Sequence, residues 1–380
     1  MDIVDLHNHS IFSDGYVKPK EFVSEIYREK FILKKKNLNL RAIALTDHDS
    51  MNGIEPIKRS LVEYEEENGI SDKILFLNGI ELSTKTINQE VHILGYFPWN
   101  RLTEIDSKLG AEIQDNMTIR NNFYRFKQMP LLLELIERRL SDLTGRTVSY
   151  DIGALSKELE KNYQEFRKTS FDSKSDLDYI QWILPFPRSL IRKVLAQLNL
   201  PIEVITQYMK RTDPENILES FYLDLNRKSE SPLLEEQVRN LARGDVGKYI
   251  YIEEITKNYM PTERAVELIN SVNGKSFFAH PYELINKNGK KFFETFVHEI
   301  LIPSGLGGIE CYYPDHSPEL INYLIKFSKA NGLLISGGTD NHFKGNNRDF
   351  LITHVSLKIP FELYEQIIKP VGDFNYNVGG

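Results

Sequence analysis

Cysteine and long apolar segments are scarce in this chain. Cys311 is its only cysteine, so no disulfide can form within the chain and the fold does not depend on an oxidising compartment. The sequence contains no uninterrupted apolar run of about 18 residues, and its first residues lack the basic region and apolar stretch of a signal peptide. We therefore expect a cytoplasmic protein without a membrane partner.

An excess of basic residues is also missing. The 54 Asp and Glu residues outnumber the 47 Lys and Arg residues, for a formal net charge of -7. Proteins that bind long nucleic acids normally show a basic excess or a basic stripe, so the sequence predicts no long duplex nucleic acid as a partner. A small anionic substrate is compatible with this charge if metal ions, each with about two positive charges, attract it locally.

Short apolar runs alternate with longer amphipathic stretches at both ends of the chain, which is typical of β/α units and a largely parallel sheet. The predicted strands are 2–6, 41–46, 74–82, 89–96, 275–280, 307–313, 332–338 and 351–358, and the predicted helices are 19–36, 52–68, 261–273, 288–302 and 317–331. Residues 101–260 instead combine high charge with helical spacing. We predict an α/β fold whose two parts, 1–100 and 261–380, flank a helical insertion at 101–260.

Histidine and carboxylate residues recur where the predicted strands end. His7 and His9 lie at alternate positions at the end of the first strand, so their side chains point to one face. The pattern continues at Asp14, Asp47, His48, Asp49, Glu81, His92, His280, Glu310, Asp340 and His342. In parallel β/α barrels the C-terminal strand ends form one rim, where active sites lie. We therefore expect these side chains to meet at that rim.

A structural role is the alternative for each of these residues. A single histidine beside an apolar strand is more often a satisfied structural residue than a metal ligand. Unpaired polar groups buried together at one rim would cost about 1–3 kcal/mol each, so the structural interpretation weakens as they accumulate. A set that mixes imidazole with carboxylate and lacks thiolate is typical of zinc, manganese or iron sites. We expect two or three such divalent ions.

These motifs resemble those of the PHP (polymerase and histidinol phosphatase) superfamily of metal-dependent phosphoesterases. The first motif is Asp5-Leu6-His7-Asn8-His9 with Ser13-Asp14-Gly15, the second is Ala44-Leu45-Thr46-Asp47-His48-Asp49, and the others are Glu81, His92, His280-Pro281 and Asp340-Asn341-His342. The resemblance covers residues 1–99 and 261–358 and is closest to stand-alone phosphoesterases of nucleoside phosphates, which also carry a helical insertion. The insertion is longer here, and Thr339 and Asn341 stand where serine and an aromatic residue are commoner.

The resemblance implies a distorted (β/α)7 barrel, similar to a TIM barrel, with a trinuclear metal centre at its rim. By this resemblance His7, His9, Glu81 and Asp340 hold one ion, Glu81 bridges to a second ion on His92 and His280, and Asp14, His48 and His342 hold a third. Two ions about 3.5–4 Å apart would share a hydroxide that attacks phosphorus, and the third would neutralise developing charge. Glu81 and Asp14 are therefore candidate catalytic residues as well as ligands.

Further candidates lie outside the ligand set. His316 could contact a phosphate or protonate the leaving oxygen, or it could cap the following helix. Arg120 and Arg125 in the insertion could bind a substrate phosphate, although a solvated helix face is the commoner role. The remaining carboxylates, Asp5, Asp47, Asp49 and Glu310, are predicted to orient ligand imidazoles, with a purely structural role as the alternative. His298 and His354 are predicted to be structural.

Three functions are compatible with these residues. The leading one is hydrolysis of a small phosphorylated substrate, which is a nucleotide, a nucleoside bisphosphate or the end of a short RNA. The second is hydrolysis of histidinol phosphate or another sugar phosphate. The third is a non-catalytic module for partner binding, but all nine expected ligand positions carry His, Asp or Glu, which argues against a degenerate site.

Overall fold

The structure, a computed structural model, divides into two compact units. It describes residues 1–15, 17–97, 109–123, 128–144, 190–191, 194–195, 198, 200, 202–208, 214–249, 259–343 and 357–369. The first unit is formed by Met1–Gln114 and Tyr259–Gly380, and the second by Asp115–Asn258. The first boundary predicted for the insertion, at residues 100 and 101, lies outside the described residues, whereas the second, at 260 and 261, lies among them; both stay a prediction.

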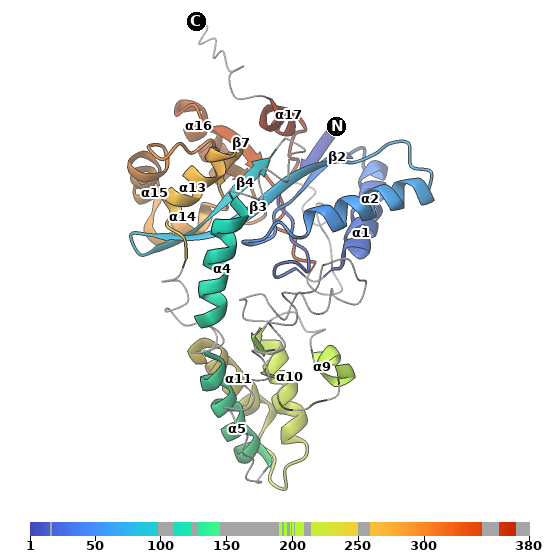
Figure 1. The fold of residues 1–380 in the computed structure, drawn as a ribbon, viewed down its shortest axis with the longest axis vertical. Helices are drawn as coiled ribbons and strands as arrows, with labels where there is room; N and C mark the ends of the chain where they lie inside the picture. The colour runs from blue at the N-terminus through green and yellow to red at the C-terminus, as the bar shows by residue number, and fades with distance from the viewer. Residues whose placement is uncertain are drawn as a thin grey trace, which may run out of the picture. The chain divides into compact units, whose positions relative to one another are not determined.

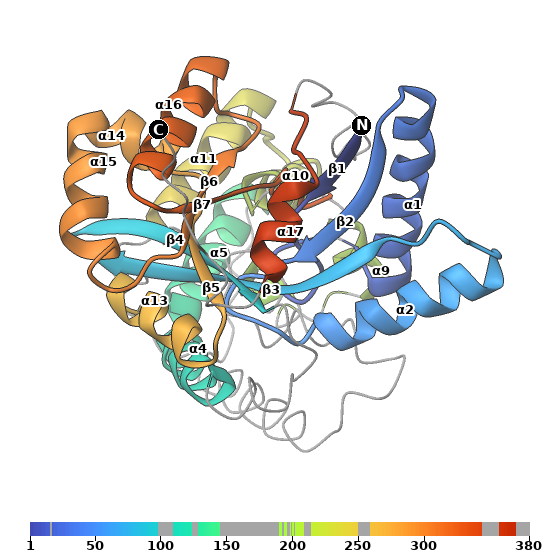
Figure 2. The same cartoon turned by 90° about the horizontal axis from the view of Figure 1, so that it is seen from above.

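A seven-stranded mixed sheet forms the centre of the first unit (Figures 1 and 2). Its strands follow one another in chain order as β1 (Asp2–Asp5), β2 (Asn39–Leu45), β3 (Leu75–Thr86), β4 (Gln89–Phe97), β5 (Lys275–Phe278), β6 (Gly308–Tyr312) and β7 (Leu334–Gly337). Each of these strands lies within or beside a predicted one. The α/β class is therefore confirmed.

The direction of β4 differs from the largely parallel sheet that we predicted. β4 is antiparallel to both β3 and β5, while the other neighbouring pairs are parallel. The β3–β4 turn contains Ile87 and Asn88 with φ of 46° and 56°. Two consecutive residues with positive φ form the short turn that joins antiparallel strands. Because β4 is reversed, His92 lies beside the C-terminal end of β5, where the Ala279 amide donates to the His92 carbonyl at 3.0 Å.

The predicted closed barrel is not formed by strand pairing among the described residues. β1 and β7 lie at the two ends of the strand order. Backbone hydrogen bonds still connect these ends, from the Leu6 amide to the Gly337 carbonyl at 3.1 Å and from the His9 amide to the Asn341 carbonyl at 2.9 Å. Asp340 has a φ of 52°, so the chain leaves the extended conformation just after β7 and cannot continue the ladder. Most of the predicted strand 351–358 lies outside the described residues.

Helices cover the sheet of the first unit. Beside the first strands lie α1 (Pro19–Lys35) and α2 (Ile54–Glu67), and beside the later ones lie α13 (Thr262–Ser271), α14 (Tyr282–Asn288), α15 (Lys290–Phe296), the π-helical turn η3 (Val297–Leu301) and α16 (Pro318–Ala330) (Figure 2). α17 (Glu362–Ile368) follows β7. α1 begins at Pro19, whose fixed φ suits the first helical turn. The sequence did not predict α14 or α17.

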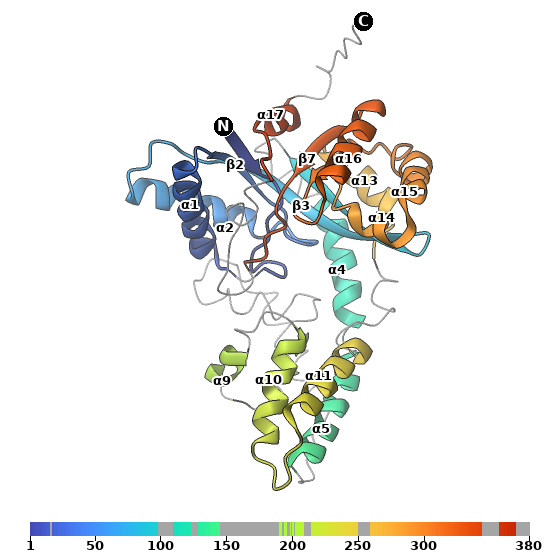
Figure 3. The same cartoon turned by 180° about the vertical axis from the view of Figure 1, so that it is seen from behind.

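The second unit is built from helices in its described part. These are α5 (Met129–Thr144), α9 (Ile202–Tyr208), α10 (Pro214–Asn226) and α11 (Glu235–Tyr249), and α4 (Ala111–Phe123) crosses into this unit from the first (Figures 1 and 3). Arg139 on α5 donates two hydrogen bonds to Asp245 on α11, each at 2.9 Å, and Tyr222 on α10 donates to the same carboxylate at 3.0 Å. A buried carboxylate thus joins three helices.

None of the described helices combines the length and apolar character needed to cross a bilayer.

Candidate metal centre

The structure brings together the nine side chains predicted as metal ligands. Eight of them fall into three overlapping groups, each with its ligand atoms within 4.8 Å of one another: His9, Asp14, His48 and His342; His7, His9, Glu81 and Asp340; and His48, Glu81 and His92. The ninth, His280, places Nε2 3.0 Å from Glu81 Oε1. Residues that are far apart in the sequence therefore meet at the edge where β1, β2 and β5–β7 end.

Glu81 in β3 is the centre of this cluster and is fully buried. Its Oε2 atom lies 3.0 Å from His7 Nε2 and 3.1 Å from His9 Nε2. Its Oε1 atom lies 2.9 Å from His92 Nδ1 and 3.0 Å from His280 Nε2. The two oxygens of one carboxylate thus face two different pairs of imidazoles, which is the arrangement that a bridging ligand requires.

Asp340 completes the group around His7 and His9. Its Oδ1 atom lies 2.9 Å from His9 Nε2 and 3.3 Å from His7 Nε2. Within the described part of the chain, His9 Nε2 and Asp340 Oδ1 are buried and have no hydrogen bond of acceptable geometry. Buried polar atoms normally find partners. Ligand atoms that converge without bonding one another fit a divalent cation held between them.

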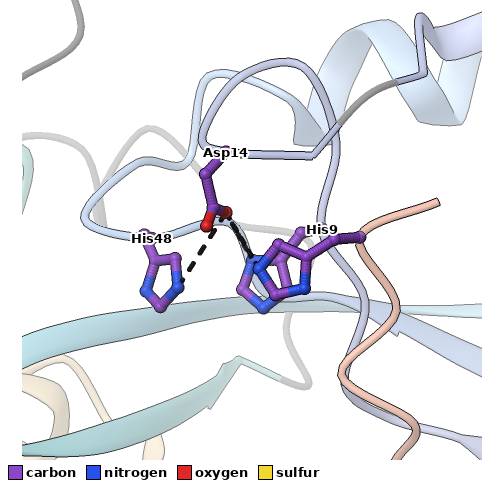
Figure 4. A group of neighbouring side chains, drawn as sticks. His9, Asp14 and His48 are labelled. Carbon is purple, nitrogen blue, oxygen red and sulfur yellow. Dashed lines mark ion pairs between the residues drawn. The ribbon is translucent and has the colours of Figure 1, made fainter. Parts of the chain in front are cut away.

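A second carboxylate, Asp14, lies among three imidazoles. Its Oδ1 atom is 3.1 Å from His342 Nε2 and 3.9 Å from both His9 Nδ1 and His48 Nε2. Figure 4 shows Asp14 between His48 and His9, with dashed lines to both rings. The resemblance assigned Asp14, His48 and His342 to one ion. The structure adds His9 to their group, because its two ring nitrogens face different carboxylates.

Charge and burial shift the pKa values of the clustered histidines in opposite directions. Burial by itself lowers the pKa of a histidine, but Asp340 and Glu81 outweigh it at His9 and raise that pKa to about 10. The Glu81 carboxylate likewise raises the pKa of His280 to about 9. At His48 burial prevails and lowers the pKa to about 4. Protons on His9 and His280 thus balance the carboxylates, and a bound cation would replace them.

Glu310 and Tyr313 contact the ligand side chains from outside the cluster. Glu310 Oε1 accepts from His7 Nδ1 at 2.9 Å, and Glu310 Oε2 accepts from the His280 amide at 2.8 Å. Glu310 is therefore placed to orient an imidazole, as predicted. The Tyr313 hydroxyl donates to Asp340 Oδ2 at 3.0 Å. Sequence reasoning missed Tyr313, although its place just after β6, three residues beyond Glu310, was a usable signal.

Asp5 and Asp47 hold loops of the site and make no direct hydrogen bond to an imidazole among the contacts described, contrary to the prediction. Asp5 accepts from the Thr339 amide at 2.9 Å and from its hydroxyl at 2.6 Å, which ties the end of β1 to the segment after β7. Asp47 accepts from the Ser10 amide and hydroxyl at 2.6 and 2.7 Å and from the Ser13 hydroxyl at 2.7 Å. These bonds fix the His7–Asp14 loop. Asp49 accepts from the Ser83 amide at 3.0 Å.

Comparison with known proteins finds relatives that match about a quarter of the chain. No family model matches the chain. It is 29% identical over 93 residues to the 5'-3' exoribonuclease Rnm of Escherichia coli strain K12, and 32% identical over 91 residues to the 5'-3' exoribonuclease of Haemophilus influenzae. Each match covers 24% of this chain and 27% of the relative, so the chain spans about a quarter of the length of these relatives.

Two solved structures extend the likeness to nearly the whole chain. One is a protein from Bifidobacterium adolescentis proposed to be a metal-dependent phosphoesterase, with a TM-score of 0.50, 17% identity and coverage of 97% of this chain and 96% of that chain. The other is an amidohydrolase from Chromobacterium violaceum with bound sulfate, with a TM-score of 0.50, 20% identity and coverage of 97% and 99%. The chain therefore shares the fold of these two proteins.

The remaining candidates are placed differently from the sequence prediction. The N-cap of α16 is Ser317, whose hydroxyl accepts from the Leu320 amide at 3.2 Å, so the helix-cap alternative for His316 is wrong. Arg120 lies in α4 within the second unit and is only 2% exposed, so it does not occupy a solvated helix face. Its contact with substrate stays a prediction. Arg125 and His354 lie outside the described residues, and His298 is exposed on η3.

Proposed function

We propose that this chain is a metal-dependent phosphoesterase, a hydrolase that acts on phosphate esters of nucleotides, nucleoside bisphosphates or short oligoribonucleotides. The observation that carries the proposal is the position of Glu81, whose two oxygens face separate imidazole pairs at 2.9–3.1 Å. Carboxylate and imidazole ligands without thiolate suit zinc, manganese or iron. The phosphoesterase fold of the neighbouring structures supports the same reaction class.

Each proposed ion has a set of ligand side chains. His7, His9, Glu81 and Asp340 would hold the first, Glu81, His92 and His280 the second, and Asp14, His48 and His342 the third. When bound, such ions activate water near neutral pH and stabilise the charge that develops on a phosphoryl group in transfer. Glu81 would then be the catalytic bridge between the first two ions, and Asp14 would be a ligand of the third.

The residues around the ligands supply orientation. Glu310 accepts the Nδ1 proton of His7, so that Nε2 is the ring nitrogen left to bind an ion between Glu81 and Asp340. Tyr313 fixes the second oxygen of Asp340 and leaves the first directed at the imidazoles. Asp47 keeps the His7–Asp14 loop in place through two serine hydroxyls. Preorganised ligands of this kind need no rearrangement when charge develops during the reaction.

The nucleotide or RNA substrate is the finer part of the proposal. Two of the relatives are named as 5'-3' exoribonucleases, which favours ribonucleotide esters over other phosphates. Histidinol phosphate or another sugar phosphate is the alternative substrate class. A non-catalytic binding module is the alternative of a different kind, and the complete ligand set argues against it.

A substrate panel with a ligand variant tests this proposal. The chain would be reconstituted with Mn²⁺, Zn²⁺ or Fe²⁺ and assayed on nucleoside monophosphates, 3',5'-bisphosphates, short oligoribonucleotides and histidinol phosphate. We expect turnover of the nucleotide esters by the wild type and by Glu90→Gln, whose carboxylate is exposed on β4. Glu81→Ala should abolish it. An active Glu81→Ala protein with normal metal content would contradict the scheme, and exclusive activity on histidinol phosphate would replace the substrate class.

A further inference from the structure

We propose that His316 accepts a hydrogen bond from a hydroxyl group of the substrate and thereby favours phosphate esters with a free sugar hydroxyl over their deoxy counterparts. This inference rests on the proposed function, because it concerns the part of the substrate next to the reacting phosphate. It makes the His316 ring a hydrogen-bond acceptor, whereas contact with a phosphate or protonation of the leaving oxygen would require the ring to donate.

The hydrogen bond of the other ring nitrogen fixes the tautomer of His316. The side chain is 5% exposed, and its Nδ1 lies 2.8 Å from the carbonyl oxygen of Cys311. A carbonyl oxygen can only accept, so Nδ1 carries the proton and donates it. Nε2 of the neutral ring is then an acceptor. This atom is buried and has no hydrogen-bond partner within the part of the chain that the structure describes.

Aromatic side chains connect His316 to the metal centre. Its ring lies 5.3 Å from that of Tyr313 and 6.1 Å from that of Tyr282, and the two tyrosine rings stack at 6.0 Å. The Tyr313 ring is in turn 5.5 Å from the His280 ring, and its hydroxyl binds Asp340. His316 therefore belongs to an aromatic group that borders two proposed ligands and contains the half-buried Tyr282.

The chemistry of a buried neutral acceptor selects its partner. The lone pair of Nε2 would be repelled by phosphate oxygens, which are acceptors as well. Burial lowers the pKa of His316, which favours the neutral ring and agrees with the tautomer that the Cys311 contact requires. A donor is needed opposite Nε2, and the hydroxyl groups of a ribose are the donors nearest to the phosphate in a ribonucleotide. A site built to bind a hydroxyl rejects the analogue that lacks it, because its polar group is then left unpaired.

Two substitutions separate the acceptor from the rest of the side chain. In His316→Asn the amide nitrogen can take the place of Nδ1 and keep the bond to Cys311, while the acceptor at the position of Nε2 is lost. In His316→Gln the amide reaches the position of Nε2 and can still accept. His298→Asn is the matched control, because His298 is exposed on η3.

The test measures affinities of the metal-loaded proteins for adenosine 5'-monophosphate and for its 2'-deoxy and 3'-deoxy analogues by calorimetry. We expect the wild type and His298→Asn to bind the parent nucleotide about tenfold more tightly than one of the deoxy analogues. His316→Asn should bind all three equally, and His316→Gln should recover part of the preference. The analogue that discriminates identifies the hydroxyl.

The outcomes separate this inference from the proposed function. Equal affinities for all three nucleotides in the wild type, or a preference that survives in His316→Asn, would overturn the role of His316. An equal loss of affinity for all three in His316→Asn would also overturn it, because that result indicates a phosphate contact. In each case turnover of the substrate panel by the wild type would leave the phosphoesterase proposal standing. Absence of turnover together with an intact hydroxyl preference would overturn the phosphoesterase proposal and leave the role of His316 standing.

Discussion

Glu310 Oε1 lies 2.9 Å from His7 Nδ1, and neither side chain has any exposed surface. Because Glu310 accepts the Nδ1 proton of His7, Nε2 is the ring nitrogen that faces Glu81 and Asp340 and can bind an ion there. The other Glu310 oxygen accepts from the His280 amide at 2.8 Å. One carboxylate in β6 therefore positions two proposed ligands that follow different strands.

Replacing this carboxylate should weaken metal binding without removing a ligand. In Glu310→Gln the amide can donate to His7 Nδ1, which would reverse the tautomer. We expect affinity for Mn²⁺ or Zn²⁺, measured by calorimetry, to fall about 10–100-fold. Glu299→Gln, at an exposed position on η3, serves as control and should bind like the wild type. Unchanged affinity in Glu310→Gln would show that His7 needs no such support.

Gly338, directly after β7, lies in close contact with His7. A Cβ atom at position 338 would lie 2.2 Å from the Cβ of His7 and 2.4 Å from its backbone nitrogen. Gly338→Ala should therefore displace His7, lower the free energy of unfolding by about 1–3 kcal/mol and reduce metal affinity. Denaturant unfolding and metal titration measure both effects. At Gly244, in α11, none of the described atoms lies within 4 Å of an added Cβ, so Gly244→Ala is the matched control. Similar behaviour of the two variants would refute the steric argument.

The hydroxyl of Tyr313 should strengthen metal binding through its hydrogen bond to Asp340. Tyr313→Phe keeps the ring between His280 and His316 but removes the donor to Asp340 Oδ2. A hydrogen bond to a charged group contributes about 1.5–3 kcal/mol, so we expect metal affinity to fall by roughly tenfold or more. Tyr323→Phe removes a comparable bond to Glu294, at 2.8 Å, in another part of the unit and should leave the affinity unchanged. Equal affinities in the two variants would contradict a positioning role for Tyr313.

Cys311 offers a pH-dependent measure of folding. Burial raises the pKa of its thiol to about 12, whereas an unfolded thiol titrates near pH ~8.5. Above pH ~8.5 the unfolded chain therefore loses a proton that the folded chain keeps, so this group lowers stability as pH rises towards 12. Cys311→Ala should show a smaller loss of unfolding free energy between pH 8 and 10. An identical pH profile for the variant and the wild type would contradict the buried thiol.

Labelling of the same thiol should report metal binding. Because the Cys311 side chain is fully buried, its reaction with a disulfide reagent at about pH 8 requires opening of the fold. Ions that bind only the folded chain suppress opening by mass action. We expect Mn²⁺ or Zn²⁺ to slow labelling in the wild type, and the effect to vanish in Glu81→Ala. Fast labelling at a rate that does not change with denaturant concentration would refute this account.

The sequence predicted where strands lie better than how they run. Apolar runs such as 41–46 and 275–280 correspond closely to β2 and β5, because buried strands need continuous apolar residues. The direction of β4 depends on the positive φ values of Ile87 and Asn88, which β-branched isoleucine gives no reason to expect. The sequence does not predict α14, because the seven residues of this helix are too few to show helical periodicity.

The candidate ligands could be predicted because ionisable residues directly after apolar strands, or within them as at Glu81 and His92, are unusual. The residues that hold these ligands in place could not be predicted in the same way. Thr339, Ser10 and Ser13 hold Asp5 and Asp47 through hydroxyl groups, and serine or threonine in a loop is too common to attract notice. Tyr313 differs from these residues, because its position directly after β6 was a usable signal. The charge-rich sequence around Arg120 gives no indication that this side chain is buried.

Anomalous diffraction from crystals grown with Mn²⁺ tests the central claim most directly. We predict anomalous peaks within coordination distance of Glu81, one on the side of His7, His9 and Asp340 and one on the side of His92 and His280. Loss of both peaks in Glu81→Ala crystals, with the sheet intact, would agree with the bridge. Well-ordered wild-type crystals with no metal between these side chains would contradict it.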